Sequence, residues 1–106
     1  MERHPVIRMW ITNKNSMDIT DKMRDSMVTF LSIANENGCI GSTFAEDNER
    51  VIVYTKWSDE STLEAFRLSE AYSHQEGEII QSFVAAGFDL SSDILFNSTA
   101  KILYSD

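Results

Sequence analysis

The chain is poor in cysteine, proline and glycine, with one, one and four of these residues among 106. The single cysteine, Cys39, has no second thiol for an internal disulfide or for a thiolate metal site, which suits a reducing compartment. Scarce proline and glycine, in a chain that is 42% hydrophobic, are not typical of a disordered protein. These features predict one compact domain over residues 1–106, near the commonest domain size.

Positive charge and long apolar runs are also scarce. Nine Lys and Arg residues against 17 Asp and Glu residues give a formal net charge of −8 and a pI near 4.6. This balance disfavours nucleic acid and anionic membrane surfaces as partners. No apolar run approaches the length of a membrane span, and residues 1–5 lack the apolar core of a signal peptide. We therefore expect a soluble cytoplasmic protein.

Short β-branched and aromatic runs predict the strands. They lie at residues 6–12, 39–45 and 50–57, and the acidic, turn-prone residues 46–49 join the second and third runs as a hairpin. The apolar residues between 94 and 104 predict one long or interrupted last strand around a polar stretch.

Apolar residues at steps of three and four predict the helices. The first begins near residue 20 and ends at Gly38, since glycine favours the backbone conformation that follows a helix. A second helical region follows the third strand, with Ser58 as its cap. It breaks near residues 69–71 and continues to Gly87.

The order strand, helix, strand, strand, helix, strand predicts an α+β, ferredoxin-like βαββαβ fold, in which helices cover one face of an antiparallel four-stranded sheet. The strand at 50–57 is apolar on both sides, and Trp10 lies between Met9 and Ile11. The second face of the sheet therefore needs a cover as well. A second copy of the same sheet is the simplest cover, so we expect a homodimer.

The most distinctive motif lies between residues 51 and 72. An apolar strand ends in tryptophan, a serine-capped helix follows, and a Ser-x-x-aromatic step comes about three turns later. This segment resembles the antibiotic biosynthesis monooxygenase (ABM) domain family of the dimeric α+β barrel superfamily, and the whole chain fits that family in length and element order. The matching residues are Trp57, Ser58, Ala65, Phe66, Ser69 and Tyr72.

The resemblance implies a dimeric α+β barrel with a pocket between sheet and helices in each subunit. Family members that oxidise quinols or polyketide-derived phenols use no metal or flavin, because the ionised substrate itself reacts with dioxygen. The protein has to hold the ring, favour loss of the phenolic proton and exclude water. The expected function is thus cofactor-independent monooxygenation of a small electron-rich aromatic. A non-catalytic dimer that binds a small apolar molecule and an isomerase of a small metabolite are the alternatives.

Two residues are candidates for the chemistry. Tyr72 stands where many relatives carry histidine, and it either offers its hydroxyl to a substrate oxygen or only packs locally. Glu76 falls on the same helical stripe as Tyr72, Ile79 and Phe83. Burial on that stripe would make it a candidate general base, whereas a position at the helix margin would leave its carboxylate in water.

Four residues are candidates for substrate binding. Trp57 and Phe66 would wall the pocket, although Trp57 also suits a purely structural place in the core. Trp10 and Arg8 would contribute from the first strand. Arg8 is embedded in an apolar run, where its charge needs solvent, a carboxylate or an anionic ligand. A salt bridge is the simplest use for it, and binding of an ionised phenol is the alternative.

We expect no cofactor and no metal. His4 and His74 are far apart and have no thiolate partner, and His74 falls on the side of its helix opposite Glu76. The haem-degrading branch of the family pairs an asparagine on the first strand with a tryptophan and a histidine on the second helix. Those helical positions are Phe66 and Glu76 here, and no asparagine precedes Asn13, so haem degradation is disfavoured.

Overall fold

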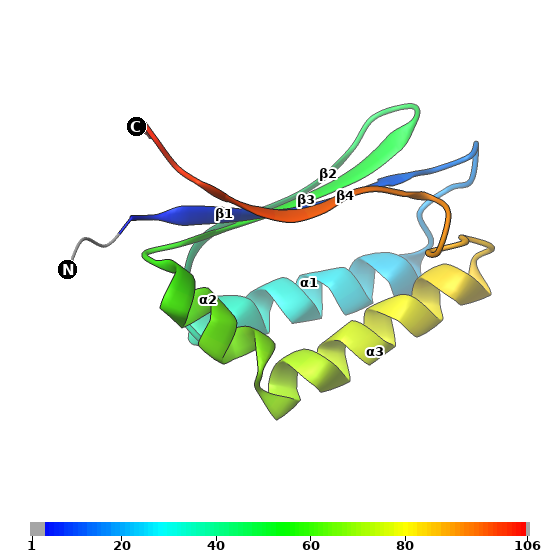
Figure 1. The fold of residues 1–106 in the computed structure, drawn as a ribbon. Helices are drawn as coiled ribbons and strands as arrows, with labels where there is room; N and C mark the ends of the chain where they lie inside the picture. The colour runs from blue at the N-terminus through cyan, green and yellow to red at the C-terminus, as the bar shows by residue number, and fades with distance from the viewer. Residues whose placement is uncertain (1–3, 106) are drawn as a thin grey trace.

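The computed structural model describes residues 4–105, which form four strands and three helices. Figure 1 shows the helices together on one face of the sheet, as the ferredoxin-like α+β prediction requires. The elements are β1 (Val6–Asn13), α1 (Asp21–Glu36), β2 (Cys39–Glu46), β3 (Arg50–Trp57), α2 (Glu60–Arg67), α3 (Glu70–Ala85) and β4 (Ile94–Lys101). Residues 1–3 and 106 lie outside the described residues. All four belong to the predicted domain, and residues 1–3 also belong to the segment expected not to be a signal peptide.

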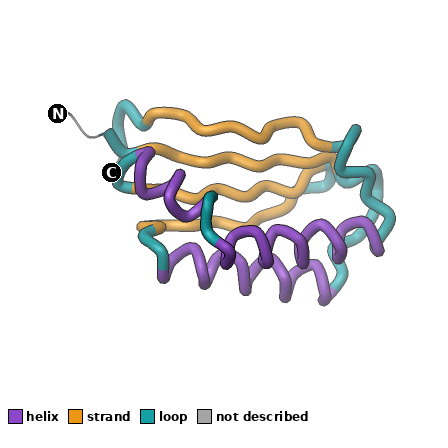
Figure 2. Tube along the Cα trace, turned by 60° about the horizontal axis from the view of Figure 1, so that its bottom comes forward, coloured by secondary structure: helices purple, strands orange, loops and turns teal. Residues whose placement is uncertain are grey.

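The sheet has the strand order β2-β3-β1-β4, and every neighbouring pair is antiparallel. The four strands run side by side in Figure 2, with the helices packed beneath them. In the central pair, Val6 of β1 lies opposite Trp57 of β3, and Asn13 lies opposite Arg50. The predicted order of elements along the chain and the predicted antiparallel four-stranded sheet are confirmed.

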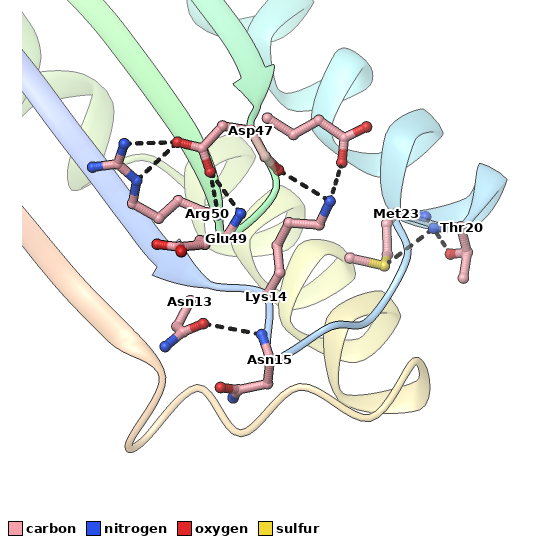
Figure 3. A network of polar contacts seen from close by, with 9 residues as sticks. Asn13, Lys14, Asn15, Thr20, Met23, Asp47, Glu49 and Arg50 are labelled. Atoms are coloured by element: carbon pink, nitrogen blue, oxygen red, sulfur yellow. Dashed lines mark hydrogen bonds and ion pairs between the residues drawn. The ribbon is translucent and has the colours of Figure 1, made fainter.

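The predicted hairpin turn at residues 46–49 is also confirmed. The Asp47 carboxylate accepts hydrogen bonds from the backbone N–H groups of Glu49 and Arg50, at 2.8 and 2.6 Å. It also pairs with the Arg50 side chain at 2.6 Å. Figure 3 shows this turn and Lys14, whose Nζ donates to Glu46 Oε2 at 2.8 Å. The side chains of the turn thus satisfy backbone groups that a tight turn leaves without strand partners.

The helix termini match the prediction with one correction. Gly38 follows the C-cap of α1 with φ +108°, and a Cβ there would lie 2.6 Å from Thr62 Cγ2, so both conformation and space require glycine. The cap of α2, however, is Asp59 rather than Ser58. One Asp59 oxygen accepts hydrogen bonds from the Thr62 backbone N–H at 2.8 Å and from the hydroxyls of Ser61 and Thr62. A carboxylate has the acceptor capacity and the charge that suit a helix N-terminus.

The predicted last strand begins at the expected residue, Ile94, but ends earlier than expected. β4 runs without interruption through the polar residues 97–99 and ends at Lys101, so Leu103 and Tyr104 lie beyond it and are exposed. The polar residues belong in the strand because Asn97 and Thr99 accept hydrogen bonds from a β1 side chain, described below.

The core between sheet and helices consists of two clusters. The first joins α1, β3 and α3 around Met23, Val53 and Phe83. The second joins the opposite end of the sheet to α2 around Trp57 and Phe66. Phe30 of α1 packs against both clusters.

The outer face of the sheet carries no helices in Figure 1. Ile7, Met9 and Ile11 of β1 lie on this face, each partly exposed and opposite Lys56, Tyr54 and Ile52 of β3. Phe96 of β4, 57% exposed, lies opposite Ile11. On β3, Val51 and Val53 are buried on the side of the helices, and Ile52 and Tyr54 lie on the outer face. The prediction that β3 is apolar on both sides is therefore confirmed.

None of the helices formed by residues 4–105 combines the length and hydropathy that crossing a membrane requires.

Candidate functional site

A cavity of about 290 Å³ lies between the helix-facing side of the sheet and the helices. Residues of both core clusters contribute to its wall, so it occupies the space where the two clusters meet. The structure brings all six of the predicted site residues to this one cavity, while their roles stay predictions. They are Arg8, Trp10, Trp57, Phe66, Tyr72 and Glu76.

Aromatic rings form one end of the cavity wall. Trp57 is 1% exposed and stacks on Phe66, with ring centroids 5.5 Å apart and 27° between the planes. Tyr72 meets Phe66 edge-on at 5.4 Å. The Trp57 indole is held in place because its Nε1 donates to Thr55 Oγ1, on the same strand, at 2.9 Å. Phe66 is 3% exposed, so the two stacked rings belong to the core, as the structural alternative for Trp57 required, and they also form the apolar back of this end of the cavity.

Phe30 is a wall residue that the sequence analysis did not single out. Its ring centroid lies 5.9 Å from those of both Phe66 and Tyr72. It lies on the apolar stripe of α1, and helical periodicity alone assigns such a residue to the core. Trp10, on the other hand, was expected here, and it packs edge-on against Phe83 at 5.3 Å.

Tyr72 and Glu76 form a hydrogen-bonded pair one turn apart on α3. The Tyr72 hydroxyl donates to Glu76 Oε2 at 2.8 Å. Tyr72 is half-buried, and Glu76 is exposed although it lines the cavity. Of the two places expected for Glu76, the structure therefore shows the one at the helix margin, where the carboxylate reaches water. Burial raises the pKa of Tyr72, and the hydrogen bond to Glu76 and its negative charge raise it further, while Arg67 acts in the opposite direction.

Arg8 extends from the middle of β1 into the cavity and is half-buried. Its Nη1 donates to Thr99 Oγ1 at 3.0 Å, and its Nη2 donates to Asn97 Oδ1. Both partners are neutral, and no carboxylate within residues 4–105 lies at ion-pair distance from Arg8, so among these residues Arg8 is held by hydrogen bonds and not by the expected salt bridge. Burial lowers the pKa of Arg8, and the positive charge of Arg67 lowers it further.

Arg67, at the end of α2, is a second arginine in the wall that the sequence analysis did not select. Its Nη1 donates to Glu64 Oε1 at 3.0 Å. Its Nε is buried and has no hydrogen-bond partner in the described part of the chain. The available signal was its place directly after Phe66 in the family-like motif.

His74 lies outside the cavity. It lines a shallow surface groove between α1 and α3 beside Lys22 and Asp25, which confirms that it is on the side of α3 opposite Glu76. Between residues 4 and 105, no group of three or more His, Cys, Asp or Glu side chains is arranged to hold a metal ion. Independence from a cofactor stays a prediction.

Solved structures of several bacterial proteins share this fold. SnoaB of Streptomyces nogalater, a cofactor-independent oxygenase, superposes with a TM-score of 0.65 at 4% identity, over 99% of this chain and 96% of that one. NE2512 of Nitrosomonas europaea, a protein of unknown function, gives 0.63 at 13% identity, over 98% and 93%. Rv0793 of Mycobacterium tuberculosis gives 0.62 at 13% identity, over 96% of each chain. At these identities the likeness shows the fold alone.

Sequence comparison adds the family. Among proteins with curated functions, none matches this chain. The sequence model of the family described as antibiotic biosynthesis monooxygenase does match, over residues 17–75, which is more than half of the chain and includes the motif at Trp57 to Tyr72. The chain therefore belongs to the antibiotic biosynthesis monooxygenase family.

Proposed function

We propose that this protein is a cofactor-independent monooxygenase that oxidises a small electron-rich phenol such as a quinol. The observation that carries the proposal is the Tyr72–Glu76 pair beside an aromatic-walled cavity. Family membership and the fold shared with a cofactor-independent oxygenase support the same reaction class.

In the proposed reaction, the ring of the quinol lies against the Trp57–Phe66 stack with one hydroxyl near Glu76. Glu76 is exposed but lines the cavity, and its carboxylate accepts the phenolic proton. The Tyr72 hydroxyl then turns its hydrogen bond from Glu76 to the substrate oxygen that becomes negative. The quinolate then reacts with dioxygen. One oxygen atom is added to a ring carbon, the other leaves as water, and the quinol supplies all four electrons as it becomes a hydroxyquinone.

The size of the cavity favours a small substrate. Ligand pockets commonly measure about 300–1,000 Å³, and this cavity of about 290 Å³ is at the lower end. We therefore propose a one-ring or two-ring quinol rather than a larger polycyclic polyketide.

We also propose that the protein works as a homodimer through the outer face of the sheet. Ile7, Met9 and Ile11 form an apolar row on that face, and Phe96 extends it onto β4. Soluble monomers seldom leave a continuous apolar patch of this kind in water. A second copy would cover this face and leave the cavity, which is on the opposite side of the sheet, open to its ligand.

Dioxygen uptake by the purified, metal-free protein with 1,4-naphthalenediol tests the proposed activity. We expect uptake above the rate without protein, and no effect of a chelator. Binding of the diol without uptake would support the non-catalytic binding dimer instead. Conversion of the diol in the absence of dioxygen would support the isomerase.

The role of Glu76 is tested by Glu76→Gln, which keeps the shape of the side chain and removes its basicity. We expect kcat to fall by about 10²-fold or more, the usual contribution of a general base. Glu78→Gln is the matched control, because Glu78 is on the same helix but lines the groove beside His74. Equal kcat in the two variants across the pH range would remove Glu76 from the mechanism.

A further inference from the structure

The charge of the cavity wall is opposite in sign to that of the protein. The whole chain carries a formal net charge of −8. Yet the charged side chains that line the cavity are two arginines, Arg8 and Arg67, and one carboxylate, Glu76. The wall thus has two positive charges against one negative charge, while Glu64 pairs with Arg67 from beside the wall.

Arg8 is the less balanced of the two guanidinium groups. Within residues 4–105 it donates only to the neutral oxygens of Asn97 and Thr99. Arg67 has an ion pair with Glu64 through Nη1, and although burial lowers the pKa of Arg67, Tyr72 and Glu64 raise it above its ordinary value. The buried Nε of Arg67 has no hydrogen-bond partner in the described part of the chain. The two groups also repel each other, because the charge of Arg67 contributes to the lowered pKa of Arg8. An anion between them would relieve the repulsion and supply acceptors.

A phenolate formed in the site would not supply the missing partner of Arg8. When the phenol gives its proton to Glu76, the phenol gains the negative charge that Glu76 loses, so the total charge of the site stays the same. Arg67 already pairs with Glu64, whereas Arg8 has only neutral partners among residues 4–105. A ligand that enters with one negative charge of its own would balance Arg8, and a phosphate dianion would exceed that charge.

We infer that Arg8 and Arg67 form a subsite for a carboxylate substituent, so that the preferred ligand is a phenol that carries a carboxylate on its ring. Planar guanidinium groups match the two oxygens of a carboxylate in geometry as well as charge. The Trp57–Phe66 stack holds the aromatic ring of the same molecule. This inference rests on the proposed function, since it names the class of substrate for that site.

Calorimetric titration with 2-naphthol and 3-hydroxy-2-naphthoate tests the subsite, because the two probes share the ring and hydroxyl and differ in the carboxylate. We expect the wild-type protein to bind the carboxylate at least about tenfold more tightly. Arg67→Gln and Arg8→Gln should each remove most of that preference and leave the Kd for 2-naphthol within about twofold. Arg50→Gln is the matched control, since Arg50 belongs to the exposed hairpin turn and should keep the preference.

Equal affinity of the wild-type protein for the two probes would overturn the subsite. So would a preference that survives in both cavity variants. Arg8→Gln also removes hydrogen bonds to β4, so its thermal unfolding is compared with that of the wild type. Arg67→Gln, which leaves the sheet untouched, tests the subsite independently of that effect.

Oxygen uptake separates this inference from the proposed function. A carboxylate preference in binding, with no uptake for 1,4-naphthalenediol or its 2-carboxylate, would contradict the monooxygenase and retain the subsite. Uptake with the same kcat/KM for both compounds would retain the monooxygenase and overturn the subsite.

Discussion

Both faces of the sheet are mainly apolar, and each carries side chains that its surroundings do not suit. The face that the helices cover is sheltered from water, yet it carries Arg8, Thr55, Asn97 and Thr99 beside the cavity. The outer face is open to water in the single chain, yet β1 places Ile7, Met9 and Ile11 there. Polar side chains inside and apolar side chains outside both carry a cost in a monomer. A ligand on one face and a second protein chain on the other would relieve both costs.

The largest expected effect comes from removing an aromatic ring of α3 that packs against the sheltered face through Trp10. Phe83 is fully buried in the first core cluster, so Phe83→Ala should lower the free energy of unfolding by about 3–5 kcal/mol in a urea titration. Phe96→Ala on the outer face is the comparison, since Phe96 is 57% exposed. In dilute solution it should cost far less, and its effect should grow with protein concentration. Equal losses of unfolding free energy in the two variants, independent of protein concentration, would mean that no second copy covers the outer face.

A charge on the outer face should break the dimer without unfolding the chain. Ile11→Lys places an ammonium group opposite Ile52 and Phe96, where a second copy would bury it unpaired. We expect the dimer dissociation constant to rise by at least about 100-fold, seen as a fall to the monomer mass by light scattering. Val28→Lys is the control, because Val28 is also exposed but lies on α1, and its dimer should persist. A wild-type protein that is already monomeric at micromolar concentration would contradict the proposed dimer.

The smallest effect should come from the β2–β3 turn, which belongs to neither face. Hydrogen bonds from the Arg50 side chain and nearby backbone N–H groups lower the pKa of Asp47 from its ordinary value of 3.8 to about 2. The folded protein therefore binds this proton less readily than the unfolded chain does. The stabilisation is complete above pH 3.8 and is lost as the pH falls through about 2. The melting temperatures of the wild type and Asp47→Asn should thus differ slightly at pH 5 and converge towards pH 2. A difference that is constant with pH would assign the effect to something other than this carboxylate.

The order of the elements and six residues of the cavity wall were predictable from the sequence. Strand and helix periods are local properties of the chain, and the motif that begins at Trp57 carries several wall residues with it. Phe30 was not identified as a wall residue because an apolar side chain on a helical stripe has the same pattern in a core and in a cavity wall. Arg67 was not selected because its burial depends on how α2 and α3 pack together, which no local pattern records.

The errors have a similar origin. Ser58 and Asp59 are both good helix caps, and only the position of the backbone decides which one accepts the hydrogen bonds. Whether the last strand continues through residues 97–99 stayed open in the sequence because their side-chain partner, Arg8, is about ninety residues earlier in the chain.

The placement of the indole rings has an optical consequence. The chain has two tryptophans, Trp10 and Trp57, and both line the cavity, one against Phe83 and the other against Phe66. The tryptophan fluorescence of the protein therefore comes entirely from the wall of the candidate site. A molecule that enters the cavity will change this emission without any added label. Because each tryptophan reports a different end, Trp10→Phe and Trp57→Phe will show which end the molecule occupies.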